Sequence, residues 1–257
     1  MNKPRPESAG VRIKMRNVAA FLCLIGLACT SSGQHTLDLE AGYVFPGYND
    51  AAIPGDSGTR FSLTDDLEAD ETVAFRARYG CIFADRHWVG FLAAPLTMDA
   101  EGVLARDTDF NGDIFPAGTP VEATFRFDSY RLIYRYIFRE TDKWTFSFGG
   151  ALKVRDASIK LEGGGMESEK ENTGVVPLLS FSVTWTPFEK IHLLVDGEAL
   201  AAPQGRAEDV LFAMRYDFSP RLALTAGYRI LEGGADNDEV YTFALFHYAV
   251  AGLVLSF

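Results

Sequence analysis

Along most of its length the chain alternates apolar and polar residues, and runs of this pattern occur ten times after residue 33. A period of two places apolar side chains on one face of an extended strand and polar side chains on the other. Helical periodicity of about 3.6 residues is nearly absent. The sequence therefore predicts an all-β domain of ten strands, at residues 36–45, 72–83, 87–98, 121–138, 144–161, 175–186, 191–202, 209–218, 222–231 and 240–257. A count of eight stays open if two weak strands, such as 87–98, are misassigned.

The N-terminal segment has a different character from the rest of the chain. Five Lys or Arg residues precede an apolar run from Val18 to Ala28, and small residues follow it up to Gly33. A basic region, an apolar region of about 7–15 residues and a small-residue exit are typical of a secretory signal peptide. We expect residues 1–33 to be this peptide, exported by the Sec pathway, and residues 34–257 to form one domain. Lipidation of Cys29 is the weaker alternative to cleavage near Gly33.

The connections between the expected strands also alternate in length. Tight polar turns are expected at 84–86, 140–143, 187–190 and 219–221, whereas longer segments occupy 46–71, 99–120 and 162–174, with shorter ones at 203–208 and 232–239. Short turns at one end and long loops at the other are typical of transmembrane β-barrels. The sequence therefore predicts an antiparallel up-and-down barrel with both chain ends beside the short turns. The acidic loops are expected to be solvated or, alternatively, to bind divalent cations weakly.

Two sets of residues indicate that the apolar stripes face lipid. The polar stripes carry both signs of charge, and Arg outnumbers Lys, which suits bidentate pairing inside a polar lumen. The expected lumen charges are Asp38, Glu40, Arg76, Arg78, Glu122, Arg126, Arg131, Arg135, Lys153, Arg155, Asp196, Glu198, Arg215, Asp217 and Arg229. Aromatic rings gather at the tight turns, where a bilayer interface would hold them. These expected interfacial aromatics are Phe83, Trp88, Phe138, Trp144, Trp185 and Phe218.

The fourth expected strand contains a change of phase. Phe125 and Phe127 alternate on one parity, and Tyr130 and Leu132 alternate on the other. If all four of these side chains face lipid, the strand must contain one extra residue between the first pair and the second. We therefore expect a β-bulge near residues 128–129.

The last residues carry a family resemblance. Gly252, Leu255 and the terminal Phe257 resemble the C-terminal signal of Gram-negative outer-membrane β-barrel proteins, although Val250 stands where that signal usually has a polar residue. The resemblance implies insertion by the barrel-assembly machinery and contact with outer-membrane lipid and lipopolysaccharide. We expect a monomer located in the outer membrane.

Motifs for chemistry are sparse. None of the four histidines stands at a metal-pair spacing or in a nucleophile motif, and the net charge of −11 argues against nucleic-acid binding. Asp107, Asp109, Asn111 and Asp113 match the first half of a calcium loop, but Gly118 stands where the bidentate Glu belongs. A polar Asn-Gly turn is the favoured interpretation. No catalytic residue and no cofactor is expected beyond weak divalent cations at the loops.

These observations favour a structural or surface-interaction role for a barrel whose lumen is plugged by its own charges. Three alternatives remain at this point. They are an outer-membrane enzyme acting on lipid or peptide, a narrow solute pore, and a soluble lipocalin-like barrel whose apolar stripes face inward.

Overall fold

The computed structural model describes residues 33–203 and 205–257, so the expected signal peptide lies outside the described part except for Gly33. The described part is all-β, and no helix within it has the length and apolar content needed to cross a bilayer. Its wall consists of β1 (Gln34–Ala52), β4 (Thr72–Phe83), β5 (His87–Ala94) with β6 (Thr97–Val103), β9 (Pro120–Glu140), β10 (Trp144–Gly163), β11 (Met166–Phe188), β12 (Ile191–Ala202), β13 (Gly205–Ser219), β14 (Leu222–Asp236) and β15 (Tyr241–Ser256).

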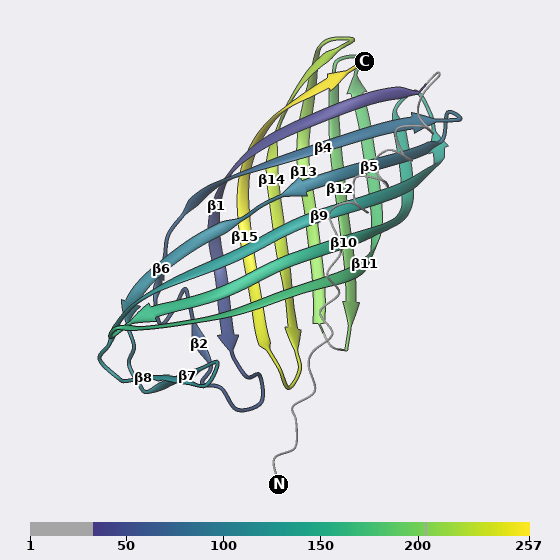
Figure 1. Cartoon of the computed structure of the whole chain (residues 1–257). Coiled ribbons are helices and arrows are strands. Elements are labelled where there is room, and N and C mark those ends of the chain that lie inside the picture. The colour runs from purple at the N-terminus through teal and green to yellow at the C-terminus, as the bar shows by residue number, and fades with distance from the viewer. Residues whose placement is uncertain (1–32, 204) are drawn as a thin grey trace.

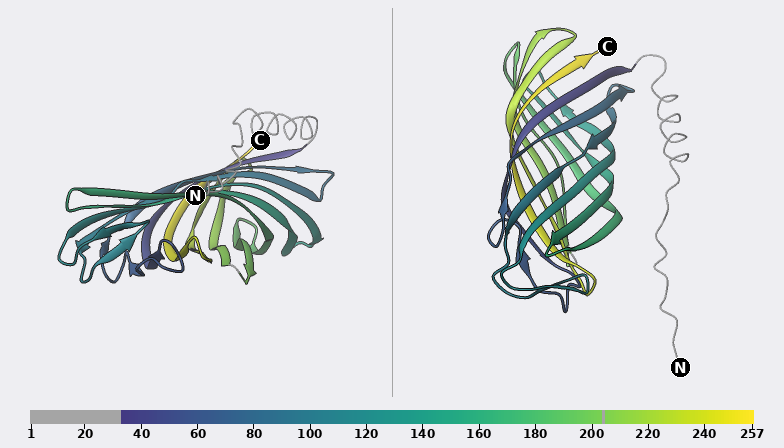
Figure 2. Two further views of the ribbon diagram at one scale, coloured as in Figure 1. Left: turned by 60° about the horizontal axis from the view of Figure 1, so that its bottom comes forward. Right: turned by 60° about the vertical axis from the view of Figure 1, so that its left-hand side comes forward.

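Every neighbouring pair in this wall is antiparallel, and β1 pairs with β15 to close the barrel. β5 and β6 both pair with β9 and occupy one place in the wall, so the ring has ten places. The expected strand 87–98 is therefore divided at Pro95, which has no N–H to donate to the ladder. The strands tilt strongly across the barrel, as closure requires (Figures 1 and 2). The prediction of a closed ten-stranded antiparallel barrel is confirmed.

The two ends of the barrel differ. At the turn end, short turns follow β4, β9, β11 and β13, and the backbones of His35 and Phe257 exchange two hydrogen bonds of 3.0 Å. At the loop end, segments 53–71 and 104–119 contain the short strands β2 (Phe61–Ser62), β3 (Glu68–Ala69), β7 (Thr108–Phe110) and β8 (Asp113–Phe115). Figure 1 shows β2, β7 and β8 gathered at the end opposite the C-terminus.

The prediction of a long loop at 162–174 is wrong. β10 and β11 continue outward in register and are joined by Gly164 and Gly165 alone, both in the left-handed region with φ of 60° and 78°. Two residues with positive φ form the type I′ turn that matches the twist of a hairpin. The connections after β12 and β14 are also short, so only two connections at this end are long.

The expected bulge near 128–129 is also wrong, because β9 pairs with β10 without a register shift from Val121 to Ile137. Uninterrupted alternation places Phe125 and Phe127 on the same face as the buried Arg131 and Arg135. The phase change in the sequence therefore marks a change in the lumen itself, from apolar near the loop end to charged near the middle. The prediction of a bulge requires every ring on this strand to face lipid, and Phe125 and Phe127 do not.

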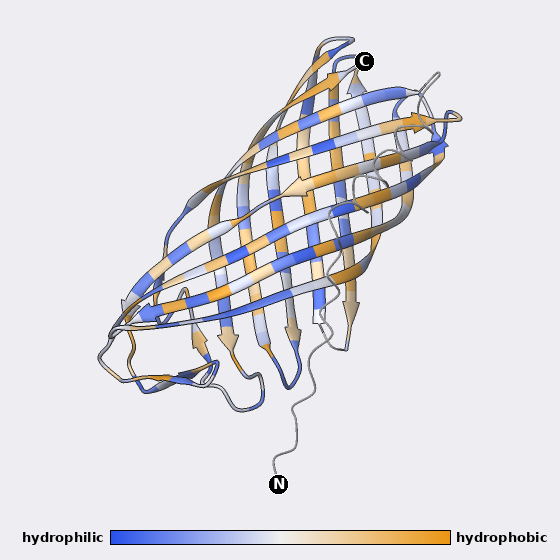
Figure 3. Cartoon of the chain, viewed as in Figure 1, coloured by the Kyte–Doolittle hydropathy of each residue, from blue (hydrophilic) through white to orange (hydrophobic). Residues whose placement is uncertain are grey.

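The outer surface of the wall is apolar around the ring. Large apolar side chains are exposed on strands around the whole ring. They include Phe75 of β4, Tyr134 of β9, Phe148 of β10, Phe212 of β13 and Leu253 of β15. Figure 3 shows the alternation of hydrophilic and hydrophobic residues along the strands that places them there. Aqueous exposure of so much apolar surface is unusual for a soluble protein, whereas lipid is its natural environment. This facing is the opposite of the lipocalin-like alternative.

An apolar cluster occupies part of the lumen near the loop end. Phe61 from the first long loop and Phe110 and Phe115 from the second are buried in a cluster with Phe125 and Phe246 of the wall. The rings of Phe61 and Phe110 meet edge to face, with centroids 5.8 Å apart. The two long loops therefore fold inward as part of the core.

Candidate functional site in the barrel lumen

Charged side chains bridge the lumen near its middle. Arg78 of β4 donates to Asp196 of β12 at 2.7 Å and to Asp38 of β1 at 3.0 Å. Arg135 of β9 also pairs with Asp196, at 2.5 Å, and with Glu198 at 2.8 Å. β4 and β12 lie five places apart in the ring of ten, so the Arg78–Asp196 pair joins opposite walls.

Asp209 of β13 is the centre of the second half of this arrangement. Its carboxylate pairs with Arg76 at 2.9 Å, Arg131 at 2.7 Å and Arg229 at 2.5 Å. Arg229 also donates to Glu40 at 2.8 Å and 3.0 Å, in a bidentate contact. Arg131 links the two halves through Glu198, at 2.6 Å.

We call these ten residues the lumen ion network: Asp38, Glu40, Arg76, Arg78, Arg131, Arg135, Asp196, Glu198, Asp209 and Arg229. Its five guanidinium groups balance its five carboxylates, and most of the members are buried. Fixed Arg forks satisfy several carboxylate oxygens at once, which is how charges can persist away from water. The network thus places paired charges across the lumen.

Asp209 was missed by the sequence analysis, and two expected members lie elsewhere. Asp209 is the first residue of the expected strand 209–218 and has the lumen parity of Arg215, so following the alternation to the start of that strand would have found it. Glu122 and Arg126 instead have the outward parity of β9, and Arg126 pairs with Asp128 and Asp156 outside the lumen. Both were placed inside because a bulge was expected between them and Arg131.

Trp88 is a further correction, since it faces the lumen rather than the bilayer interface. Its ring lies 5.2 Å from the guanidinium of Arg135 and 5.9 Å from that of Arg78, within reach of cation–π attraction. Gly80 and Gly90 make room for it, because a Cβ at either would lie within 2.8 Å of the indole. The aromatic residue next to a turn was expected to face outward, but its even parity in β5 turns it inward.

The other expected interfacial aromatics lie at the turn end. Phe138, Trp144, Trp185 and Phe218 are exposed on the outer surface, and the two Trp rings stack with centroids 5.7 Å apart. Phe83 stacks on His87 at the same end. Their role at an interface stays a prediction.

A separate polar cluster lies in the lumen at the turn end. His192 of β12 hydrogen-bonds through Nε2 to Asp217 of β13 at 2.9 Å and through Nδ1 to Thr186 at 2.9 Å. Arg215 donates to the other oxygen of Asp217 at 3.1 Å. In residues 33–203 and 205–257 this is the one histidine within 4.0 Å of a carboxylate. The carboxylate partner of His192 is thus supplied by the neighbouring strand β13.

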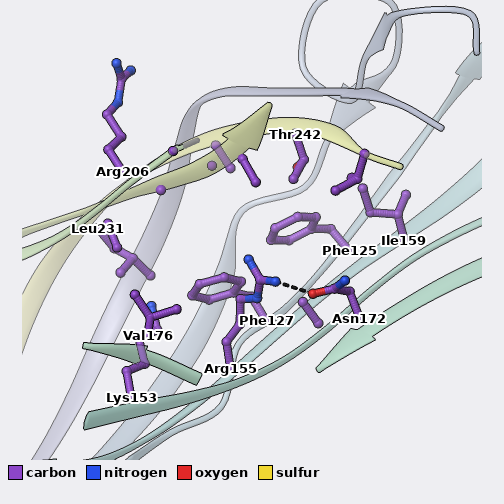
Figure 4. A pocket seen from close by; sticks show the side chains of 18 of the residues that line it. Phe125, Phe127, Lys153, Arg155, Ile159, Asn172, Val176, Arg206, Leu231 and Thr242 are labelled. Carbon is purple, nitrogen blue, oxygen red and sulfur yellow. Dashed lines mark hydrogen bonds between the residues drawn. The ribbon is translucent and has the colours of Figure 1, made fainter. Parts of the chain in front are cut away.

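On the loop side of the lumen ion network lies a cavity of about 250 Å³, which we call the loop-side cavity. One wall carries Phe125, Phe127, Lys153 and Arg155 from β9 and β10 (Figure 4). The opposite wall, from β12 to β15, is lined largely by small residues: Ala202, Gly205, Ala207, Gly233, Ala235 and Ala244. Lys153 and Arg155, both expected in the lumen charge network, therefore line a cavity instead of joining the ion pairs.

The calcium-like segment forms the β7–β8 hairpin of the second long loop. Asn111 and Gly112 have φ of 56° and 90° and make its turn, while Asp109 accepts from the Gly112 N–H at 3.1 Å. Asp107 caps the Ala117 N–H at 2.8 Å, and Asp113 accepts from Ser168 at 2.7 Å. Within the part of the chain that the structure describes, no group of three or more His, Cys, Asp or Glu residues is placed to hold a metal ion.

The C-terminal residues of the expected assembly signal lie in β15 at the seam with β1. Gly252 pairs with Glu40, and a Cβ at Gly252 would lie 2.9 Å from the Leu39 carbonyl oxygen. Leu255 and Phe257 are exposed on the outer surface, and the Phe257 ring stacks on His35 with centroids 5.8 Å apart. The seam thus ends on an accessible ring.

Comparison with known proteins gives a fold and no sequence relative. No family model matches the sequence, and no curated protein matches it significantly. The outer-membrane protease OmpT of Escherichia coli aligns with a TM-score of 0.57 and 8% identity, over 89% of this chain and 99% of OmpT. The translocator domain of the autotransporter NalP of Neisseria meningitidis has a TM-score of 0.46 and 11% identity, over 95% of each chain. The Ail protein of Yersinia pestis has a TM-score of 0.41 and 11% identity, over 87% of this chain and 99% of Ail. The fold of this chain is that of the Gram-negative outer-membrane β-barrels.

Proposed function

We propose that the protein is a monomeric outer-membrane barrel sealed by its own lumen, with a structural or surface-interaction role rather than that of a diffusion pore. Export through the Sec pathway and insertion by the barrel-assembly machinery are part of this proposal. The apolar outer surface supports a location in lipid, because a closed barrel satisfies its backbone groups internally.

The observation that carries the proposal is the contact between opposite walls. The Arg78–Asp196 pair at 2.7 Å and the Arg76–Asp209 pair at 2.9 Å span the lumen between strands that are not neighbours, which supports a seal at that level. Small barrels are generally filled by their own side chains. Side chains of the two long loops, among them Phe61, Phe110 and Phe115, are buried in the lumen at the loop end, and they support a second seal there.

Electrical recording in planar lipid bilayers tests the seal. Purified barrel of the native sequence should give no regular single-channel steps. A charge-balanced variant with Arg76, Arg78, Asp196 and Asp209 all replaced by Ala removes both bridging pairs. It should produce discrete steps in conductance.

A matched control is the pair Arg126→Ala with Asp156→Ala, which is also charge-balanced but lies outside the lumen. This control should stay silent. Regular conductance from the native protein would favour the narrow-pore alternative and contradict the seal. Silence from the quadruple variant, once its folding is shown by mobility on unboiled gels, would mean that the ion network is not what blocks the lumen.

A further inference from the structure

The charges that line the loop-side cavity have only one sign. Lys153, Arg155, Lys170 and Arg206 are its ionisable residues, and no Asp or Glu lines it. Arg206 forms an ion pair with Glu232. The other three have no carboxylate within 4.0 Å among residues 33–203 and 205–257, in a protein whose net charge is −11. The cavity therefore carries an uncompensated positive charge.

Lys153 is the most constrained of these cations. It is 3% exposed, and its ammonium lies 4.4 Å from the centre of the Phe127 ring. No hydrogen bond or ion pair to it is found among the described residues, although a buried ammonium normally needs a partner. The nearby guanidinium groups of the lumen ion network are already matched with carboxylates. Lys153 thus presents a donor that the protein itself does not use.

Arg155 presents a second unused donor beside it. Its Nη2 donates to the Asn172 side chain, as Figure 4 shows, while its Nε is buried without a partner. A guanidinium with free N–H groups next to an ammonium is suited to an anionic group such as a carboxylate. The two cations alternate on β10 with one residue between them, so both face the lumen.

The remainder of the cavity is suited to an apolar chain. Phe125, Phe127, Leu231 and Phe246 line it. The opposite wall carries Ala and Gly on β12–β15, whose small side chains leave space inside the cavity. The lining extends along β15 from Thr242 to Phe246, roughly 13 Å at about 3.3 Å per residue. A volume of about 250 Å³ equals roughly eight waters at about 30 Å³ each. Its dimensions therefore match a single chain of medium length.

We infer that the loop-side cavity binds a medium-chain organic anion, with its head group at Lys153 and Arg155 and its apolar chain running toward the loop end. Binding neutralises two buried cations and removes the chain from water, so head and tail both contribute. The lumen ion network closes the cavity on the other side, so this is a capture site and not a conduit.

Calorimetric titration of the barrel in phosphatidylcholine nanodiscs, with empty nanodiscs as the background, tests this inference. Octanoate should bind with one molecule per barrel. Octanol, octylamine and acetate should bind at least tenfold more weakly, because each lacks either the charge or the chain. Octyl phosphate tests the head group, since comparable affinity would show that the site recognises the shared anionic chemistry.

Three variants separate head-group recognition from simple partition into lipid. Lys153→Met keeps an unbranched side chain, one atom shorter, removes a buried charge that has no ion pair, and should weaken octanoate binding at least tenfold. Ala244→Leu fills the cavity and should abolish binding without changing the charge. Lys160→Met, on the outward parity of the same strand, is the matched control and should bind like the native protein.

Three results would overturn the inference. They are equal affinity for octanol and octanoate, octanoate affinity unchanged by Lys153→Met, and no octanoate binding by the native barrel. None of them depends on whether the barrel conducts ions.

Discussion

The contribution of a lumen arginine to stability depends on how deeply its side chain is buried. Arg131 and Arg215 both follow the inward parity of their strands, and each has carboxylate partners. The Arg131 side chain is fully buried, whereas that of Arg215 is 33% exposed. Desolvation makes a buried guanidinium dependent on its partners, while water and salt screen an exposed one. The same substitution should therefore have different effects at the two positions.

Replacing Arg131 by Ala leaves Asp209 and Glu198 each without one partner. We expect the free energy of unfolding to fall by about 3–5 kcal/mol. Arg215→Ala should lower it by no more than about 1 kcal/mol. Urea unfolding, followed by the mobility of unboiled samples on gels, measures both. Equal losses at the two positions would show that burial does not decide the strength of these ion pairs.

At the scale of the element, the β10–β11 hairpin shows where alternation ceases to be informative. Residues 167–172 alternate Glu with Ser, Lys and Asn, so both faces of the strand are polar. The sequence carries no apolar stripe there and a loop was expected. Register pairing with β10 extends the strand to Met166 because the Gly164–Gly165 turn permits it.

This turn predicts a contrast between two substitutions at Gly165. Its φ is 78°, and nothing lies within 4 Å of a Cβ placed there, so any effect comes from the backbone. Gly165→Val should destabilise the hairpin by about 1–2 kcal/mol, because β-branched residues rarely adopt left-handed angles. Gly165→Asn should be close to neutral. Protease cleavage between residues 160 and 171 measures local opening, and equal cleavage of the two variants would contradict the turn's role.

At the scale of the whole molecule, the barrel is held closed by the pairing of its first and last strands. β1 and β15 pair from Thr36–Ser256 to Ala52–Tyr241, and the seam ends beside the exposed Phe257 ring. An exposed ring on the last residue adds little packing to the finished barrel. We therefore expect its contribution to be made during assembly.

If the machinery inserts this barrel through Phe257, as proposed, Phe257→Ala should slow insertion severalfold into proteoliposomes that contain the machinery. Spontaneous folding into detergent micelles should proceed at the native rate, since the backbone bonds between His35 and Phe257 remain. Phe218→Ala, another exposed ring at the turn end, is the control and should be neutral in both assays. Equal slowing with and without the machinery would assign Phe257 a packing role only.

The amino-acid sequence by itself determined the fold class, since a period of two is a local property that each strand carries alone, and it predicted ten strands while leaving eight open. It also determined that Arg76, Arg131 and Arg229 share one face with Glu40, because parity is read along the chain. Which charges pair was decided only by closure, which brings β4 against β12 and β13. Unbroken register with the neighbouring strands turned Trp88, Phe125 and Phe127 inward, and closure left Lys153 facing a cavity. Alternation distinguishes the two faces of a strand, but only the closed barrel brings distant strands together.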